Sequence, residues 1–346
     1  MEIFYGISTE KLEALIRKIK SVRIAFIGDI CLDVYWKADM TKSELSRETP
    51  HYPLPVVEER MYPGAGGNAA ANAAALEPER VKLLGVVGKD WRGDVLVQKL
   101  GELHIDTDGI VASSNAVTNA YCKPIRKGIS NIEYEDPRID FGNQKDLSLQ
   151  DETELIHRLD ACIGNIDILC VSDQLPHGCI TERVREKIIA FAKQGLTVVV
   201  DSRDRIGLYK GVILKPNEVE GMRAVRKGVC PDKVPLDEYA CAAQTLAKQT
   251  GSRVCMTLGP DGCMYADLNK QIHIPSYEVA PPIDICGAGD TFMAAFSCAL
   301  AAGVEPWEAA SFANTAADVT IKKVGITGTA RCDEIASRHL EIRSRK

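Results

Sequence analysis

The segment DICGAGDTFMAAFSCALAAG, residues 284–303, is the most informative part of the chain, because a glycine-rich turn leads directly into a helix of small and apolar residues. The glycines let the backbone N–H groups of Gly287, Ala288 and Gly289 converge at the start of this helix, where the helix dipole favours a bound anion. Asp290 follows in the first helical turn. We predict that Asp290 is a general base that deprotonates a hydroxyl attacking a phosphoryl group. The alternative is an Asp that only complements the helix dipole, since short glycine motifs recur by chance.

A second glycine-rich turn, PGAGGNAAANAAAL at residues 63–76, also leads into a helix. Gly64, Gly66 and Ala69 satisfy the G-x-G-x-x-A pattern of dinucleotide-binding sites, and Asp90 follows at a suitable distance. However, such a site follows directly from the first buried strand, whereas here a long proline-bearing insertion lies between them. The chain also contains no G-x-x-x-x-G-K-[ST] motif.

We therefore predict that this turn binds a small polyol. The glycines at 64, 66 and 67 allow close approach to the backbone, and Asn68 offers amide hydrogen bonds. Asn72 lies one helical turn further on and has the same chemistry. A closely packed Ala/Gly helix without ligand contacts is an equal alternative for Asn72.

Around these two turns, apolar runs rich in Val and Ile alternate with segments of helical period. This alternation predicts an α/β fold with a mostly parallel central sheet covered on both faces. One helix is expected at 181–194, with Thr181 as its N-cap. The expected central strands are 22–28, 81–87, 166–172, 196–201, 211–215 and 253–258.

Two segments, about 30–61 and 115–141, depart from this pattern and alternate polar and apolar residues. We expect antiparallel strands outside the main sheet, forming a small lid inserted in a single domain that spans 1–346. A lid matters in phosphoryl transfer because it excludes water from the acceptor.

The composition excludes several classes of protein. Hydrophobic residues make up 45% and charged residues 26% of the 346, as in ordinary globular enzymes. The net charge of −6 argues against a nucleic-acid partner. The absence of a long apolar run argues against association with a membrane. We expect a cytoplasmic protein whose 12 cysteines, which show no CxxC or zinc-type spacing, are mostly small buried hydrophobes.

Five motifs occur in the order found in one enzyme family, and together they resemble the PfkB, or ribokinase-like, carbohydrate kinases over nearly the whole chain. The resemblance implies a ribokinase-like three-layer sandwich with a small β lid. It also implies transfer of the γ-phosphoryl group of ATP, with Mg²⁺, to a sugar hydroxyl. The motifs are Gly28, Asp29 and Asp33; Gly64, Gly66, Gly67 and Asn68; Asn217 and Glu220; Thr257, Gly259 and Gly262; and 284–290 followed by Asn314.

The resemblance also implies roles for these residues. Asp33, Gly64, Gly66, Gly67 and Asn68 would bind the sugar. Asn217, Glu220, Thr257, Gly259, Gly262 and Asn314 would line the nucleotide, with Glu220 holding Mg²⁺ through water. Asp284 would lie near a monovalent cation that some relatives bind, but Ile285 and Cys286 replace the usual Thr-containing pattern, and a requirement for potassium is therefore in doubt.

Within the family, the segments around residues 28–36 and 46–71, the SDQLPHG turn with Asp173, and LKPNEVE resemble the kinases that convert heptose 7-phosphate to heptose 1,7-bisphosphate. Asp173 is accordingly a candidate substrate ligand, and a homodimer through the lid is a further expectation. A sugar phosphate needs local cations. The cationic residues on the lid segments are Lys42, Arg47, Lys123, Arg126 and Arg138. The alternative for each of them is a solvated position on the lid surface without a ligand.

Other functions stay open at this point. A ribokinase- or fructokinase-like enzyme would act on an unphosphorylated sugar, and a non-catalytic sugar or nucleotide sensor could use the same fold. A dehydrogenase could use the turn at 64–69 for NAD. ATP consumption with a panel of sugars and sugar phosphates separates these alternatives.

Overall fold

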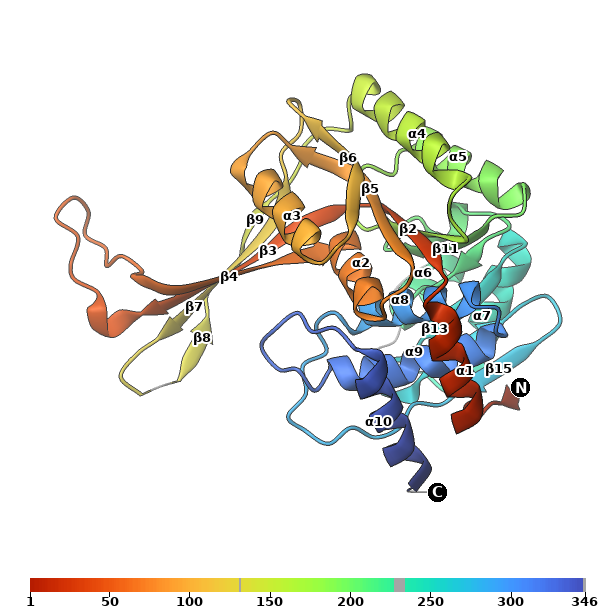
Figure 1. The fold of residues 1–346 in the computed structure, drawn as a ribbon. Coiled ribbons are helices and arrows are strands. Elements are labelled where there is room, and N and C mark those ends of the chain that lie inside the picture. The colour runs from red at the N-terminus through yellow and green to blue at the C-terminus, as the bar shows by residue number, and fades with distance from the viewer. Residues whose placement is uncertain (131, 227–233, 345–346) are drawn as a thin grey trace.

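The structure, a computed structural model, describes residues 1–130, 132–226 and 234–344, and a ten-stranded sheet runs through its centre (Figure 1). The sheet is parallel apart from β14, which pairs antiparallel with both of its neighbours. The strand order is β1 (Glu2–Ile3), β15 (Gln271–Ile274), β14 (Cys263–Ala266), β13 (Arg253–Thr257), β12 (Ile213–Leu214), β11 (Thr197–Ser202), β10 (Ile168–Asp173), β2 (Arg23–Gly28), β5 (Arg80–Gly88) and β6 (Asp106–Ser113).

The six strands expected from the sequence are all present, with ends shifted by one or two residues, and the predicted α/β class is confirmed. The largest difference is at β12, where only two of the five expected residues lie in the strand. Strands β1, β6, β14 and β15 were not anticipated. All four lie at or near the ends of the sheet, where short or partly solvated strands lack a continuous apolar run.

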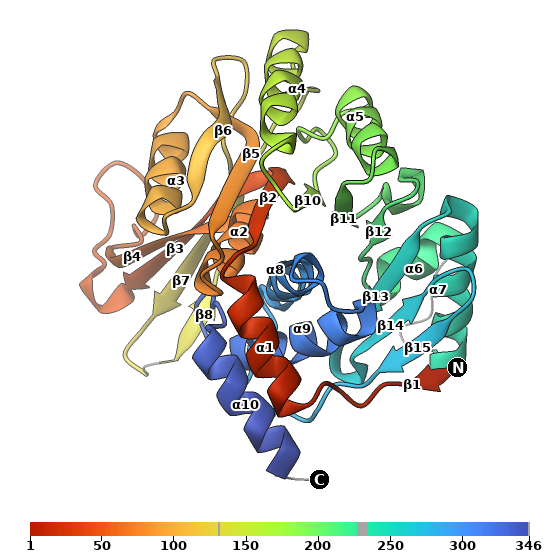
Figure 2. The same cartoon turned by 45° about the vertical axis from the view of Figure 1, so that its right-hand side comes forward.

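Helices cover both faces of the sheet, which curves around α8 in Figure 2. One buried cluster lies beneath α1, α2, α3, α8, α9 and α10, and the other lies beneath α4, α5, α6 and α7. Thr181 caps α5 as predicted, since its hydroxyl accepts a hydrogen bond from the N–H of Val184. The helices are α1 (Thr9–Ile19), α2 (Gly66–Ala75), α3 (Trp91–Glu102), α4 (Leu149–Ile163), α5 (Glu182–Lys193), α6 (Glu218–Val225), α7 (Leu236–Thr250), α8 (Ala288–Ala301), α9 (Pro306–Thr320) and α10 (Cys332–Ser344).

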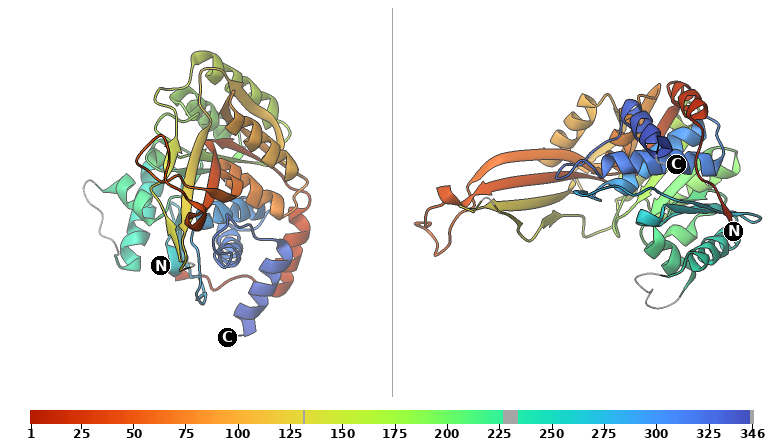
Figure 3. Two further views of the ribbon diagram at one scale, coloured as in Figure 1. Left: turned by 90° about the vertical axis from the view of Figure 1, so that its left-hand side faces the viewer. Right: turned by 90° about the horizontal axis from the view of Figure 1, so that it is seen from below.

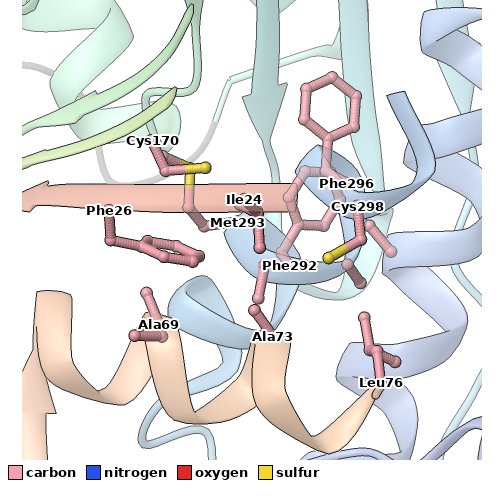
Figure 4. Close-up of a cluster of buried hydrophobic side chains, with 14 of the residues drawn as sticks. Ile24, Phe26, Ala69, Ala73, Leu76, Cys170, Phe292, Met293, Phe296 and Cys298 are labelled. Carbon is pink, nitrogen blue, oxygen red and sulfur yellow. The ribbon is translucent and has the colours of Figure 1, made fainter. Parts of the chain in front are cut away.

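Helices α2 and α8 begin at the two glycine-rich turns and pack against each other beside β2. In Figure 4, Ala69 and Ala73 of α2 face the larger side chains of Phe292 and Met293, with Phe26 of β2 alongside. All five side chains are buried. Because alanine carries only a methyl group, the two helices can approach closely, and this approach brings their first turns together.

The two segments predicted to leave the core form a second sheet that projects from the body (Figures 1 and 3). Its order is β4-β3-β7-β8, with β9 also paired to β7. The prediction of antiparallel strands is correct except for β3 and β7, which pair in parallel because they come from separate excursions of the chain. The strands are β3 (Ile30–Asp39), β4 (Val56–Ala65), β7 (Asn119–Lys127), β8 (Glu133–Glu135) and β9 (Ile139–Phe141).

Asp29 joins the two sheets. It lies between β2 and β3, and its backbone carbonyl accepts the N–H of Gly66 at 2.9 Å, at the start of α2. Its buried carboxylate accepts backbone N–H bonds from Gln174, Leu175 and Cys179 at 2.7–2.8 Å. Burial raises the pKa of Asp29 to about 6, although these three bonds favour the ionised form. One residue therefore fixes the start of α2 and the loop after β10.

Among the described residues, eight cysteines are buried, Cys241 and Cys286 are exposed, and all of those described are free thiols. This agrees with the expectation of small buried hydrophobes. None of the described helices has the length and apolar character required to cross a bilayer.

We expect the substitution Asp29→Ala to lower the free energy of unfolding by about 3 kcal/mol or more, because three buried N–H groups lose their acceptor. Urea unfolding followed by circular dichroism measures this loss. Asp267→Ala is the matched control, since Asp267 also accepts two backbone N–H bonds, but in an exposed turn. Equal losses in the two variants would show that Asp29 has no special structural role.

Candidate active site

The first turn of α8 carries the predicted base and anion site. Gly287 has a φ of +79°, a left-handed conformation that favours glycine, and it is the N-cap of the helix. The N–H of Ala288 donates to the carbonyl of Ile285 at 3.2 Å, so this group is engaged within the turn. The anion site formed by the amides of Gly287, Ala288 and Gly289 stays a prediction, in which the Ala288 amide already has one acceptor.

Asp290 lies directly beside α2. Its Oδ2 accepts a hydrogen bond of 2.7 Å from Nδ2 of Asn68. Burial raises the pKa of Asp290 to about 7, and the carboxylates of Asp201 and Asp33 add to this effect. The bond from Asn68 and the charge of Lys215 act in the opposite direction. A carboxyl group with a pKa near neutrality is suited to take up and release a proton.

A buried ion pair lies next to the base. Lys215, only 3% exposed, follows β12 and contacts Asp201 of β11 at 2.9 Å. Burial lowers the pKa of Lys215, but Asp201 and Glu220 outweigh this and leave it raised. Asp201 was not predicted from the sequence. The available signal was a lysine at the end of an apolar strand, because a buried ammonium group requires a carboxylate partner.

Asn217 and Glu220, predicted to line the nucleotide, form the capping box of α6. The Asn217 side chain accepts the N–H of Glu220, and Oε2 of Glu220 accepts the N–H of Asn217, both at 2.8 Å. Burial, with the charge of Asp201, raises the pKa of Glu220 to about 7. These residues therefore have a structural role that leaves the second carboxylate oxygen of Glu220 for other contacts.

The predicted nucleotide loop lies beside this capping box, because Asn217 pairs with Thr257 at the end of β13. The loop closes when the N–H of Leu258 donates to the carbonyl of Gly262 at 2.8 Å. Gly262 has a φ of +87°, and a Cβ there would clash with the carbonyl of Ile274. Gly259 also has a positive φ, of 55°. The T-x-G-x-x-G spacing therefore reflects backbone geometry.

Asn314, expected near the adenine, lies on α9 and is 9% exposed. Its Nδ2 donates to the carbonyl of Ile274, the same residue that limits the side chain at position 262. Asn314 thus lies next to the predicted nucleotide loop.

The residues predicted to bind the sugar lie on β3 and β4 and at the start of α2. Asp33 is 9% exposed, and burial raises its pKa while Lys123 and Arg138 oppose this effect. A Cβ on Gly64 would lie 3.0 Å from the Asp33 carboxylate. Gly66 and Gly67 begin α2, and a Cβ on Gly66 would lie 2.9 Å from the carbonyl of Asp29. Glycine at 64 and 66 is therefore required by close packing.

Asp173 does not lie as predicted. Its side chain has no exposed surface and forms an ion pair with Arg205. It also accepts hydrogen bonds from the hydroxyls of Ser202 and Tyr209, at 2.8 and 2.9 Å. The assignment as a sugar ligand is corrected accordingly, since this carboxylate is occupied in holding the loop after β11.

Asp284 ties together the loops on either side of α8 and α9. Its Oδ1 accepts the N–H of Cys286 at 3.0 Å, and its Oδ2 accepts the N–H of Gly325 at 3.1 Å. The association of Asp284 with a monovalent cation stays a prediction.

The five predicted lid cations lie in different environments. Lys123 donates to the hydroxyl of Tyr35 at 2.9 Å and is close enough to Asp33 to influence its pKa. Arg138 forms a two-bond pair with Asp140 and lies 4.6 Å from the ring centre of Tyr121. Arg126 pairs with Asp136, Lys42 is 3.8 Å from Asp39, and Arg47 is on the exposed turn between β3 and β4. Only Lys123 and Arg138 of the five influence the pKa of Asp33.

Arg203 is a further cation, which was not predicted from the sequence. It follows β11, and its charge lowers the pKa of both Tyr121 in the second sheet and Glu220 at the start of α6. Arg203 is therefore close enough to Tyr121 on the predicted sugar side and to Glu220 on the predicted nucleotide side for its charge to act on both. Its position could not be inferred from the chain order, because it comes from neither lid segment.

Comparisons with known proteins agree with this geometry. The family model described as "pfkB family carbohydrate kinase" matches residues 23–331. Bifunctional protein HldE of Mesorhizobium japonicum is 30% identical over 94% of this chain and 63% of its own length, and that of Gluconobacter oxydans is 32% identical over 92% and 64%. The chain therefore spans less than two thirds of the length of these relatives.

Solved structures show the same fold at lower identity. Phosphofructokinase-2 from Escherichia coli in complex with fructose-6-phosphate superposes with a TM-score of 0.70, at 21% identity, covering 93% of this chain and 99% of that one. Arabidopsis thaliana ribokinase complexed with ribose and ATP gives 0.68 at 21% identity, covering 92% and 98%. The predicted ribokinase-like fold is confirmed.

We expect Lys215→Met to lower the free energy of unfolding by about 3 kcal/mol, because it leaves the Asp201 carboxylate without its buried partner. Urea unfolding measures the loss. Lys20→Met is the control, because its pair with Glu77 is largely exposed and should contribute nothing measurable. A variant at 215 as stable as the parent would contradict a stabilising role for the buried ion pair.

Proposed function

The chain belongs to the pfkB family of carbohydrate kinases, and we propose that it transfers the γ-phosphoryl group of ATP to the anomeric hydroxyl of a phosphorylated sugar, with heptose 7-phosphate as acceptor. The observation that carries the proposal is Asp290, a carboxylate bonded to Asn68, with a pKa raised to about 7, in the first turn of a helix that begins at a glycine-rich turn. In this proposal, the acceptor hydroxyl and the γ-phosphate meet beside one carboxylate.

The proposed chemistry follows from the residues around Asp290. Its Oδ2 is held by Asn68, so Oδ1 takes the proton from the acceptor hydroxyl as the oxygen attacks the γ-phosphorus. The amides of Gly287 and Gly289 and the N-terminus of α8 stabilise the negative charge on the transferring group. Lys215 adds a positive charge close to the base.

We expect ATP with Mg²⁺ as the phosphoryl donor. Glu220 and Asp201 supply carboxylates near Asp290, and the free oxygen of Glu220 suits contact with a metal-bound water. The described residues contain no cluster of three or more His, Cys, Asp or Glu side chains able to enclose a metal. This donor set fits Mg²⁺, which is commonly held by one or two carboxylates together with substrate phosphates, and which would neutralise charge on the nucleotide.

A phosphorylated acceptor is favoured by cations near the sugar side. Arg203 and Arg138 both influence Tyr121, and Arg138 and Lys123 both influence Asp33. Asp33 would accept hydrogen bonds from sugar hydroxyls, while the cations would bind the distant phosphate. The HldE relatives support a heptose phosphate, although the name belongs to proteins longer than this chain. A kinase of unphosphorylated ribose or fructose is the alternative.

The second sheet is also the proposed dimer interface. Several large apolar side chains on its strands and on the connection between β3 and β4 are exposed, and exposed apolar surface of this kind can mark a protein–protein interface. They are Tyr52, Leu54, Val56, Val57, Tyr134, Ile139 and Phe141. A small-molecule substrate and a second copy of the chain are therefore the partners we propose. A cytoplasmic location remains a prediction from the sequence.

We expect Asp290→Asn to lower kcat by about 10²-fold or more while the affinity for ATP changes little, because an amide retains the shape but cannot accept the proton. In the parent enzyme, kcat/KM should rise with pH through about 7, since only the ionised form of Asp290 is active. Coupled assays of ADP release measure kcat and the pH profile of kcat/KM, and nucleotide-binding titrations measure the affinity for ATP. Near-parental kcat in the variant would overturn the assignment.

We expect kcat/KM for heptose 7-phosphate to exceed that for ribose, fructose and fructose 6-phosphate. Arg203→Met should lower kcat/KM for the phosphorylated acceptor by about 10-fold or more, because one charge-assisted contact is lost. Lys18→Met, on exposed α1, is the control. Greater efficiency on an unphosphorylated sugar would refute the proposed acceptor and leave the kinase assignment intact.

A further inference from the structure

We propose that Asn72 and Thr291 are positioning residues, which lock the side-chain amide of Asn68 so that it always donates to Oδ2 of Asp290 and leaves Oδ1 as the proton acceptor. This inference rests on the proposed function. It assigns a role to Asn72, for which the sequence alone left a ligand contact and helix packing equally open.

The orientation of each amide follows from a backbone group. Nδ2 of Asn72 lies 3.0 Å from the carbonyl oxygen of Asn68, one turn earlier in α2. A carbonyl oxygen only accepts hydrogen bonds, so the atom facing it must be the amide nitrogen. The same nitrogen lies 3.1 Å from Oδ1 of Asn68. Asn68 must therefore present its oxygen to Asn72 and its nitrogen to Asp290, at 2.7 Å.

Thr291 holds the other side of Asn72. Its hydroxyl lies 2.7 Å from Oδ1 of Asn72 and 3.0 Å from the hydroxyl of Thr320 on α9. Donation by Thr291 to Oδ1 completes a directed series of hydrogen bonds that runs from Thr291 through Asn72 and Asn68 to Asp290. The series begins at Thr291 on α8, crosses to Asn72 and Asn68 on α2, and ends at Asp290 on α8, the residue before Thr291.

The buried position of these groups indicates that the polar chemistry matters. Asn72 and Thr291 are each 2% exposed. Leucine and valine have nearly the same shapes as asparagine and threonine and would fill this space without the desolvation cost of burying polar groups. The Thr291 hydroxyl also lies 3.2 Å from the carbonyl oxygen of Gly287, four residues earlier, a longer contact than the one to Asn72. Apolar packing between α2 and α8 therefore does not account for the polar groups of these residues, whereas orientation of Asn68 does.

Locking Asn68 favours the ionised form of the base. If Asp290 is protonated, a freely rotating amide could turn over and accept the new O–H group through its oxygen. In this site such a rotation would place the Asn68 nitrogen against the Asn72 nitrogen, and two donors would face each other. The neutral acid therefore gains no new partner, whereas the carboxylate always has its N–H bond.

The charged groups facing Asp290 come from other elements: Asp33 on β3, Asp201 on β11 and Lys215 after β12. Burial and the two carboxylates raise the pKa of Asp290, and Lys215 and Asn68 lower it. Asn68, Asn72, Thr291 and Thr320 carry no titratable group, so the orientation they impose does not change with pH. Loss of that orientation should raise the pKa of Asp290.

The test compares Asn72→Leu and Thr291→Val with the parent enzyme. We expect kcat to fall on the order of 10-fold and the acid limb of kcat/KM to move upward by about 1 in pH, because the neutral acid is now stabilised. The KM for ATP should stay within about twofold of the parent value. Thr291→Ser retains the hydroxyl and should restore both properties.

Thr250→Val is the matched control, because Thr250 is also a buried helical threonine, bonded to the carbonyl four residues earlier, but in α7 away from the site. It should leave kcat and the pH profile unchanged. If Asn72→Leu does not fold, Thr291→Val provides the same comparison. Folded variants at both positions with an unchanged acid limb would overturn the inference.

The proposed function is tested separately by turnover of the parent enzyme. If the parent phosphorylates no sugar, that proposal fails, and the inference is then decided by ¹³C NMR titration of aspartate-labelled protein. The Asp290 signal is assigned by its loss in Asp290→Asn. A higher Asp290 pKa in Asn72→Leu than in the parent supports the inference, and equal values refute it.

Discussion

The site depends on the close approach of α2 and α8. Each helix begins at a glycine-rich turn. The alanines Ala69 and Ala73 of α2 leave room for the larger Phe292 and Met293 of α8, so the two helices pack closely (Figure 4). Larger residues at these alanines would move the first turn of α2 away from Asp290. The 2.7 Å bond from Asn68 to Asp290 is thus a consequence of packing several residues away.

Burial also governs the electrostatics of the site. It raises the pKa of Asp290 and of Glu220 to about 7, well above the usual range for carboxyl groups, and the charge of Asp201 adds to both shifts. The charge of Lys215 opposes the pKa shift of both groups. Three carboxylates, including Asp201, therefore share one buried ammonium group, and without a bound cation this region carries a net negative charge.

Much of this arrangement could be predicted from the sequence, and the omissions have a common cause. The α/β class, the six central strands and the position of Asp290 follow from local periodicity and glycine placement. The partners of Lys215 and Asp173 do not, because Asp201, Arg205 and Tyr209 reach them through tertiary contacts between neighbouring strands and loops. The hydrogen bond from the Ala288 N–H to the carbonyl of Ile285 could not be predicted from the sequence either, since it depends on the backbone conformation.

The way the second sheet is attached divides the molecule into two parts whose sequences can evolve at different rates. Its strands leave the body next to Asp29, whose backbone and carboxylate bonds hold α2 and the loop after β10 in fixed positions. Substitutions at the distant ends of β3, β4 and β7 therefore leave these bonds and the first turns of both helices intact. Drift in sequence, length or surface chemistry at that end requires no compensating change in the body, whereas the junction itself has almost no freedom to vary.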